Sequence, residues 1–119
     1  VRLGWVDDDQ RLALLRGASV VAYPSRYEGF GLVPLEALAV GTPVVATAVG
    51  ALPEVVGDGA VLVPSHDVDA LADGLARVLA GGPEVTELLA RGGARVDAYS
   101  WEATVDGIVA LYRRAHEAR

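Results

Sequence analysis

The sequence predicts an α/β fold in which helices cover a parallel β-sheet. Short apolar runs without polar alternation are typical of strands buried on both faces, and longer segments carry apolar residues at helical spacing. The two kinds of segment alternate along the chain, which indicates βαβ units. With 119 residues, of which 52% are hydrophobic, the chain is long enough to form one domain with a core.

Strands and helices are expected to alternate over the first half of the chain. The predicted strands cover residues 1–6, 19–23, 44–47 and 60–63. The acidic run 7–9 supplies an N-cap and a first turn for a helix that ends at Gly17. Another helix is predicted over residues 32–40, where the glycine, threonine and proline at 41–43 end it.

Three helices are expected after Pro64. The first begins at Asp67 and closes before the Gly-Gly-Pro of residues 81–83, and the last begins at Ser100, a favourable N-cap. The apolar positions of the three helices are Leu71, Leu75, Val78 and Leu79; Leu88, Leu89 and Val96; and Val105, Ile108, Leu111 and Tyr112. We expect Trp101 and Tyr112 to pack the last helix against the rest of the domain.

Composition argues against several kinds of site and partner. The chain has no cysteine, and its two histidines, His66 and His116, are too far apart for a metal-ligand spacing, so no metal site is expected. The net charge of −6 disfavours a nucleic-acid partner. Residues 32–56 are apolar, but glutamates, glycines and prolines interrupt them, so buried strands and a helix explain this segment better than a membrane span.

The segment 27–36, Tyr-Glu-Gly-Phe-Gly-Leu-Val-Pro-Leu-Glu, follows a predicted strand, where open α/β sheets bind ligands. Gly29 and Gly31 allow a ligand to approach the backbone closely. The first amides of the helix that follows favour an anion, and a diphosphate fits this requirement. The alternative explanation for the two glycines is a turn that needs glycine conformations.

Glu28 and Glu36 frame this segment. Eight residues of helix would separate them by roughly 12 Å along the axis, more than the roughly 5 to 9.5 Å between the carboxyl groups of glycosidases. Two tasks on one long ligand fit better, because a carboxylate accepts two hydrogen bonds from a vicinal diol. One glutamate would then hold a ribose and the other a sugar, with the amides between them facing a diphosphate.

Each glutamate also has a simpler explanation. Glu28 would be an ordinary loop carboxylate, and Glu36 would lie on a solvated helix face. Glu36 stands among leucines and alanines, however, so we expect it to be partly buried and to need hydroxyl partners.

Block 28–36 resembles the E-x7-E motif of the retaining group 1, or family 4, glycosyltransferases, which have the GT-B fold. The similarity continues in blocks 41–47 and 52–59, and in residues 99–101 together with Tyr112. Because four blocks occur in the family's order and cover nearly all of the chain, the resemblance is specific.

The resemblance implies a Rossmann-like parallel sheet with flanking helices, the C-terminal part of a GT-B enzyme. Residues 1–119 would be the later part of the C-terminal nucleotide-sugar-binding domain, without the N-terminal acceptor domain. The sequence opens abruptly at Val1, so we expect a fragment. Without the acceptor domain and the phosphate-clamping region, this fragment is expected to be inactive alone. The implied reaction is hexosyl transfer from a nucleotide-diphosphate sugar, with retention of configuration, to an acceptor that the sequence does not define.

The resemblance also implies roles for single residues. Glu28 would be catalytic and hold the hydroxyls of the transferred sugar, while Glu36 would bind the ribose. The implied donor-binding residues are Gly29, Phe30, Gly31, Leu32 and Glu36. The family's diphosphate-neutralising Arg and Lys lie upstream of this region. This chain has no lysine, and Arg26 is explained as a solvated loop residue.

Metal ions and other cofactors are not implied by the resemblance. The expected location is the cytoplasm, or the periphery of the inner face of the membrane, with membrane contact only through parts outside this chain. Two alternatives stay open. The first is another GT-B protein, such as a nucleotide-sugar epimerase or a glycogen-synthase-like polymerase. A non-catalytic α/β module that binds a nucleotide or a partner is the other, although it has no use for Glu28 and Glu36.

Overall fold

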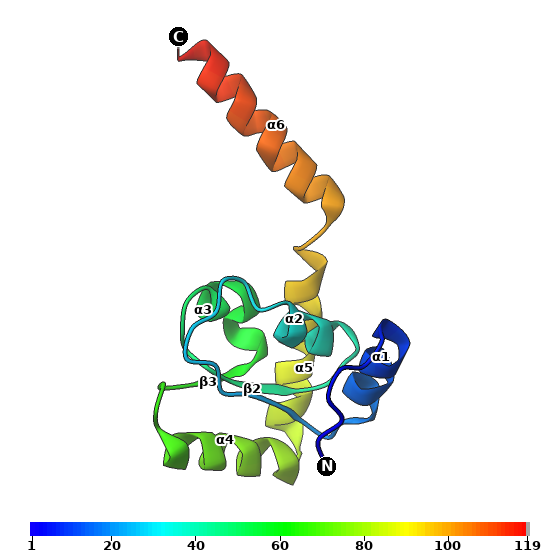
Figure 1. Ribbon diagram of the computed structural model, residues 1–119. Helices are drawn as coiled ribbons and strands as arrows, with labels where there is room; N and C mark the ends of the chain where they lie inside the picture. Colours follow the sequence, from blue (N-terminus) through cyan, green and yellow to red (C-terminus); the bar gives the residue numbers. More distant parts are fainter. Residues whose placement is uncertain (119) are drawn as a thin grey trace.

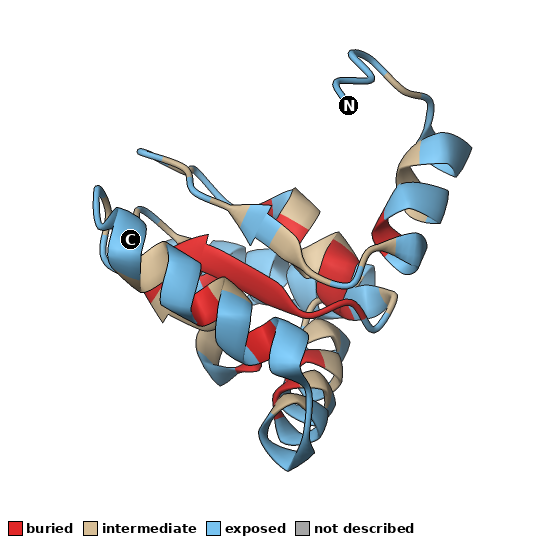
Figure 2. Ribbon diagram, turned by 90° about the horizontal axis from the view of Figure 1, so that it is seen from below, coloured by how far each residue is buried: buried red, intermediate tan, exposed pale blue. Residues whose placement is uncertain are grey.

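Three parallel strands lie at the centre of residues 1–118, the part of the chain that the computed structural model describes (Figure 1). They are β1 (Val21–Tyr23), β2 (Val44–Thr47) and β3 (Val61–Val63), in the order β1-β2-β3. Val21 lies opposite Val44, and Val45 opposite Val61, in two parallel pairs. All of β2 is buried, because it is the middle strand and both its faces are covered (Figure 2).

Helices cover both faces of this sheet. In chain order they are α1 (Asp8–Gly17), α2 (Leu32–Ala39), α3 (Leu52–Val56), the 3₁₀ turn η1 (Gly57–Gly59), α4 (Val68–Ala80), α5 (Pro83–Asp97) and α6 (Trp101–Glu117). Val44 and Ala46 share a core cluster with α2 and α3, whereas Val45 shares one with α4. Neighbouring side chains of β2 thus alternate between two apolar layers. The predicted α/β fold with a parallel sheet is confirmed.

Side-chain caps start three of these helices, as predicted. Asp7 accepts a hydrogen bond from the amide of Gln10 at 2.8 Å, and the Gln10 side chain accepts one from the amide of Asp7 at 3.2 Å. This reciprocal pair is a capping box, which fixes the first turn of α1. Asp67 and Ser100 cap α4 and α6 through one amide each.

One strand prediction is wrong, and another holds only in part. Residues 1–6 do not form a strand, and Leu3 and Trp5 are 58% and 89% exposed. A strand needs a neighbour to pair its backbone, and within residues 1–118 no strand pairs with this segment. The strand predicted at 19–23 covers only β1, an edge strand of the described sheet, and it is not buried on both faces, since Ala22 is exposed.

Helix α6 does not pack against the domain, contrary to prediction. No residue from Trp101 to Glu117 is buried, and Trp101 and Tyr112 are 83% and 70% exposed. In Figure 1, α6 leads away from the other helices. The apolar stripe correctly indicated that the segment is a helix, but a stripe alone does not determine which surface receives it.

Candidate functional site

The loop that links β1 to α2 contains most of the predicted site. It lies at the carboxyl end of the sheet, since all three strands run parallel. Gly31 is the N-cap of α2 and has a φ of +101°, and a Cβ there would lie 2.5 Å from Cδ2 of Leu52. The turn therefore needs glycine at this position. A Cβ on Gly29 would meet no described atom within 4 Å, so close approach of a ligand remains the prediction for Gly29.

Glu28 lies half-buried in this loop, with its carboxylate against neutral donors. The hydroxyl of Tyr23 donates to Oε2 at 2.6 Å, and the amide of Gly29 donates to Oε1 at 3.2 Å. The Tyr23 hydroxyl, followed by the amides of Phe30, Gly29 and Gly31, lowers the pKa of Glu28, and burial opposes this only in part. The carboxylate is therefore ionised at neutral pH. The same bond raises the pKa of the Tyr23 phenol, which stays protonated as the donor.

The backbone of the loop is held by the segment that follows β2. The amide of Ala51 donates to the carbonyl oxygen of Glu28 at 3.2 Å. The buried hydroxyl of Thr47 donates to the carbonyl oxygen of Ser25 at 2.5 Å. Residues 47–51 therefore fix the loop at two points and set the position of Glu28 relative to the sheet.

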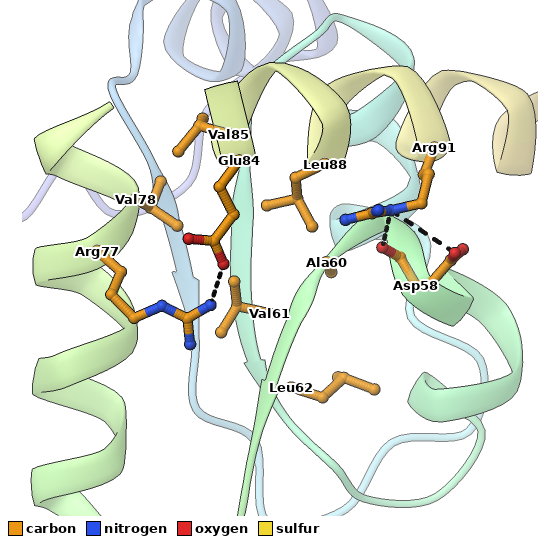
Figure 3. Close-up of a pocket in the computed structure, with 10 residues that line it drawn as sticks. All are labelled: Asp58, Ala60, Val61, Leu62, Arg77, Val78, Glu84, Val85, Leu88 and Arg91. Atoms are coloured by element: carbon orange, nitrogen blue, oxygen red, sulfur yellow. Dashed lines mark hydrogen bonds and ion pairs between the residues drawn. The ribbon is translucent and has the colours of Figure 1, made fainter. Parts of the chain in front are cut away.

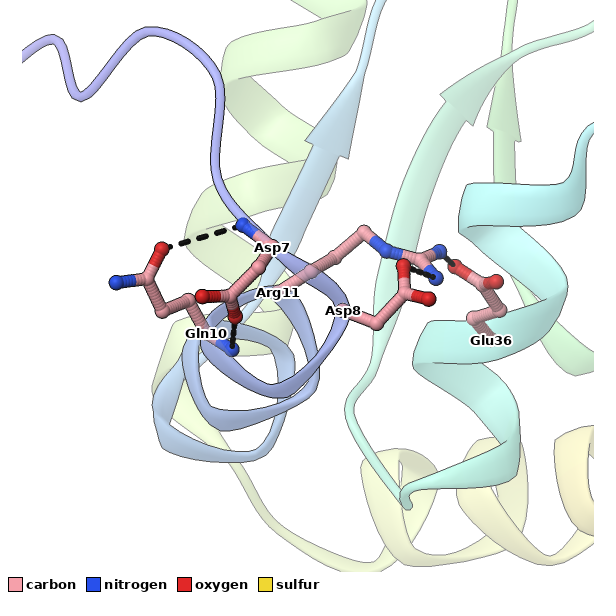
Figure 4. A network of polar contacts seen from close by, with 5 residues as sticks. All are labelled: Asp7, Asp8, Gln10, Arg11 and Glu36. Atoms are coloured by element: carbon pink, nitrogen blue, oxygen red, sulfur yellow. Dashed lines mark hydrogen bonds and ion pairs between the residues drawn. The ribbon is translucent and has the colours of Figure 1, made fainter.

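Glu36 lies on α2, with its carboxylate paired to Arg11 of α1 (Figure 4). Arg11 also donates to Asp8 at 3.1 Å, so one guanidinium bridges two carboxylates. The Glu36 side chain is 30% exposed, which confirms the predicted partial burial, but its partner is a guanidinium and not a hydroxyl. The hydrogen bond to Glu36 is the largest cause of a raised pKa at Arg11, which stays charged.

Phe30 and Leu32 present apolar surface on the same loop and at the first turn of α2. Phe30 is 41% exposed and Leu32 is 63% exposed. The Phe30 ring packs edge-on against Tyr99, with 5.6 Å between the ring centroids and 86° between the planes. The guanidinium of Arg95 lies 5.3 Å from the centroid of the Tyr99 ring. Through Tyr99 the loop is thus tied to the end of α5.

Arg11, Tyr23 and Ala51 contribute to this arrangement but were not among the predicted site residues. Tyr23 carried a usable signal, since it closes a predicted strand five residues before Glu28. Arg11 is 25 residues from its partner and gives no local sign of the contact.

A hollow of about 300 Å³ lies elsewhere, between β3, α4 and α5 (Figure 3). Its lining includes no residue of the segment 27–36. Its charged side chains form two ion pairs, Arg77 with Glu84 and Arg91 with Asp58.

Within residues 1–118, no three His, Asp or Glu side chains are grouped closely enough to hold a metal ion. The same stretch contains no helix with the length and hydropathy that crossing a bilayer requires.

Comparison with known proteins assigns the family. Residues 2–96 match the family model described as "Glycosyl transferases group 1". This chain belongs to the group 1 glycosyltransferases. The resemblance noted in the sequence is confirmed at this level, and the roles of single residues remain predictions.

Curated relatives of this group 1 chain are longer than it is. The D-inositol 3-phosphate glycosyltransferase of Saccharomonospora viridis is 53% identical over 107 residues, which are 87% of this chain and 24% of that protein. The MMP alpha-(1->4)-mannosyltransferase of Mycolicibacterium hassiacum is 46% identical over 114 residues, 92% of this chain and 28% of that protein. The chain thus spans about a quarter of the length of these relatives.

Solved structures support the fold of this group 1 chain. Sucrose-phosphate synthase from Thermosynechococcus elongatus matches with a TM-score of 0.81 and 39% identity, over 98% of this chain and 30% of that one. The C-terminal domain of a group 1 family glycosyl transferase from Francisella tularensis matches with a TM-score of 0.71 and 28% identity, over 81% of this chain and 51% of that one. The predicted Rossmann-like α/β fold is confirmed.

Proposed function

We propose that this chain supplies part of the donor site of a retaining glycosyltransferase that takes a nucleotide-diphosphate sugar. The supporting observation is that two half-buried carboxylates, Glu28 and Glu36, flank the N-terminus of α2 in a member of the group 1 family. Within residues 1–118 no side chain caps that N-terminus, so the first amides of α2 are left for a ligand. In this proposal residues 1–119 are the later part of the donor-binding domain, and other parts of the protein bind the acceptor.

Each site residue has one task in the proposal. Glu36 accepts hydrogen bonds from the ribose hydroxyls, and Glu28 accepts them from hydroxyls of the transferred sugar. The backbone at the remaining donor-binding positions lines the sugar and the diphosphate. These positions are Gly29, Phe30, Gly31 and Leu32. The placement is supported by the direction of the loop, which runs from Glu28 into the free amides of α2.

The proposed reaction keeps the anomeric configuration. The bond from the anomeric carbon to the diphosphate oxygen breaks, and a bond to the acceptor oxygen forms on the same face. The acceptor proton passes to an oxygen of the leaving diphosphate. Positive charge develops on the sugar ring in the transition state, and the ionised Glu28 stabilises that charge.

A transfer assay with the complete gene product tests this proposal. Nucleotide-diphosphate sugars and candidate acceptors are incubated in EDTA, and NMR reads the anomeric configuration of the product. We expect acceptor-dependent release of nucleoside diphosphate, retained configuration and no need for a divalent ion. An inverted product, or activity that EDTA abolishes and Mg²⁺ or Mn²⁺ restores, would contradict the proposed mechanism. A new nucleotide sugar made without any acceptor would instead identify an epimerase.

The 119-residue chain provides a second test. We expect no transfer from this chain alone, because catalysis requires both reactants to be held in register. Labelled sugar transferred by the purified chain would show that it holds the acceptor as well. We place the complete enzyme in the cytoplasm, or at the inner face of the membrane through parts outside this chain.

A further inference from the structure

Gly50, which follows β2, makes an unusually close backbone contact with Glu28. A Cβ on Gly50 would lie 2.0 Å from the carbonyl oxygen of Glu28, 3.0 Å from its carbonyl carbon and 3.1 Å from its amide nitrogen. All three atoms belong to the main chain, so no side-chain rotation would relieve the overlap. Gly50 also has a φ of +53°, in the left-handed region that glycine favours.

The neighbouring residues fasten the same junction. The amide of Ala51 donates to the carbonyl oxygen that a Cβ on Gly50 would meet. Thr47, three residues before Gly50, donates to the carbonyl oxygen of Ser25. The absence of a side chain at Gly50 is what lets these two segments approach closely enough for the Ala51 bond.

The position of the Glu28 carboxylate follows from the position of its backbone. The carboxylate is also bonded to Tyr23 and Gly29, which lie on β1 and on the loop itself. A shift of the Glu28 backbone away from Gly50 would therefore move the carboxylate relative to any ligand held at the sheet end. A displacement of about 1 Å in a catalytic constellation lowers the rate by about 100-fold.

We infer that Gly50 is a positioning residue for Glu28: its missing side chain fixes where the proposed sugar-binding carboxylate lies. The inference rests on the proposed function, since it assigns Gly50 a kinetic effect only if Glu28 contacts the transferred sugar. Gly50 itself touches no reacting atom and acts through the Glu28 backbone.

Gly41 provides a matched control. It has a φ of +78°, and a Cβ there would meet no described atom within 4 Å. Gly41→Ala therefore imposes the backbone strain of a left-handed alanine without a collision. A difference between Gly50→Ala and Gly41→Ala reports the contact with Glu28, and not the strain.

The experiment compares Gly50→Ala, Gly41→Ala, Glu28→Gln and the double variant Gly50→Ala/Glu28→Gln in the complete gene product. Steady-state kinetics gives kcat and KM, and calorimetry gives the affinity for free nucleoside diphosphate. We expect Gly50→Ala to lower kcat by about 100-fold while nucleoside diphosphate affinity changes by less than about twofold. Gly41→Ala should keep kcat within about threefold of wild type. The double variant should have no lower kcat than Glu28→Gln, because both substitutions remove the same contribution, that of the Glu28 carboxylate.

The outcomes separate this inference from the proposed function. If Glu28→Gln has wild-type kcat, Glu28 does not act on the sugar, and both fail. If Glu28→Gln is slow but Gly50→Ala behaves like Gly41→Ala, or if the two losses multiply in the double variant, only the Gly50 inference fails.

A milder pair of variants decides the matter if Gly50→Ala does not fold. Thr47→Val removes the hydroxyl that holds Ser25, and Thr47→Ser keeps it. Loosening the same junction should lower kcat severalfold in Thr47→Val, and Thr47→Ser should restore it. Wild-type kcat in Thr47→Val would show that residues 47–51 do not position Glu28.

Discussion

The loop that carries Glu28 and the helix that carries Glu36 adjoin at Gly31, but they hold their carboxylates differently. Glu28 is bonded to a tyrosine hydroxyl and a backbone amide, and within residues 1–118 no guanidinium pairs with it. Glu36 is paired with Arg11, which reaches it from α1. Neutral donors leave the charge of Glu28 uncompensated, whereas Arg11 offsets the charge of Glu36. The first arrangement suits a group that stabilises developing positive charge, and the second suits a hydroxyl acceptor near a diphosphate.

The largest predicted effect comes from removing the uncompensated charge. In the complete gene product, Glu28→Gln should lower kcat by about 100- to 1000-fold, because in the proposed mechanism it removes an electrostatic contact made in the transition state with little change of shape. Affinity for free nucleoside diphosphate should stay unchanged. Kinetics and calorimetry on the same preparation give both quantities. Wild-type kinetics would return Glu28 to an ordinary loop carboxylate.

Substitution of Glu36 should affect the binding of the nucleotide, and not the chemical step. In the proposed role Glu36 is a charge-assisted acceptor for the ribose that contributes roughly 1.5–3 kcal/mol, so Glu36→Ala should lower nucleoside diphosphate affinity by about tenfold to a hundredfold. Glu54→Ala, at an exposed position of α3, is the matched control and should bind normally. Equal losses of nucleotide affinity in Glu28→Gln and Glu36→Ala would show that the two glutamates do not divide the tasks.

Arg11 should have a smaller effect, through Glu36. Arg11→Ala keeps the Glu36 carboxylate but removes the ion pair that holds the Glu36 side chain in place. A partly exposed ion pair contributes about 0.2–1 kcal/mol. Nucleoside diphosphate affinity should therefore fall by no more than about fivefold. Arg16→Ala, exposed on the same helix, serves as the control for loss of charge. A loss in Arg11→Ala larger than that in Glu36→Ala would mean that Arg11 contacts the donor directly.

The smallest effect at neutral pH is expected from Tyr23→Phe. The Tyr23 hydroxyl is the largest cause of the lowered pKa of Glu28, so its removal should raise that pKa and move the acid limb of kcat to higher pH. Because the pKa of Glu28 is lower in the folded protein than in the unfolded chain, Glu28 stabilises the fold at any pH above its unfolded pKa. This stabilisation disappears as the pH falls through the lowered pKa. Tyr23→Phe should therefore reduce stability at neutral pH slightly and in strong acid not at all.

The pH profile of kcat and thermal melting from acid to neutral pH check this prediction. Tyr27→Phe is the control, because Tyr27 is 82% exposed. An acid limb that moves to lower pH in Tyr23→Phe would contradict the assignment of the hydrogen bond.

Local signals determined how much of the fold was predictable. The apolar run of β2, the glycine after α2 and the acidic cap of α1 each act within a few residues, and each prediction holds. Helix α3 is hard to predict although Pro53 in its first turn is a known start signal, because five residues are too few to show a period. The strand predicted at residues 1–6 and the packing predicted for α6 both fail. Each depends on a neighbouring element that covers the segment, and the segment's own residues do not show where that element lies.

The site shows the same division between local and distant information. Glu28, Glu36 and the glycines between them stand in one block and were named from it. Arg11 and Gly50 reach the block from other elements, and their contacts depend on how α1 and the segment after β2 pack. No spacing in the sequence encodes that packing.

The exposure of the two tryptophans determines what the intrinsic fluorescence of the protein can report. Trp5 is 89% exposed and Trp101 is 83% exposed, and neither belongs to the core. Their fluorescence emission should resemble that of indole in water. Denaturant that unfolds the sheet should hardly shift the emission maximum. A blue shift would instead mark the covering of an end of the chain, so intrinsic fluorescence will report what docks on this domain and stay nearly silent on whether it is folded.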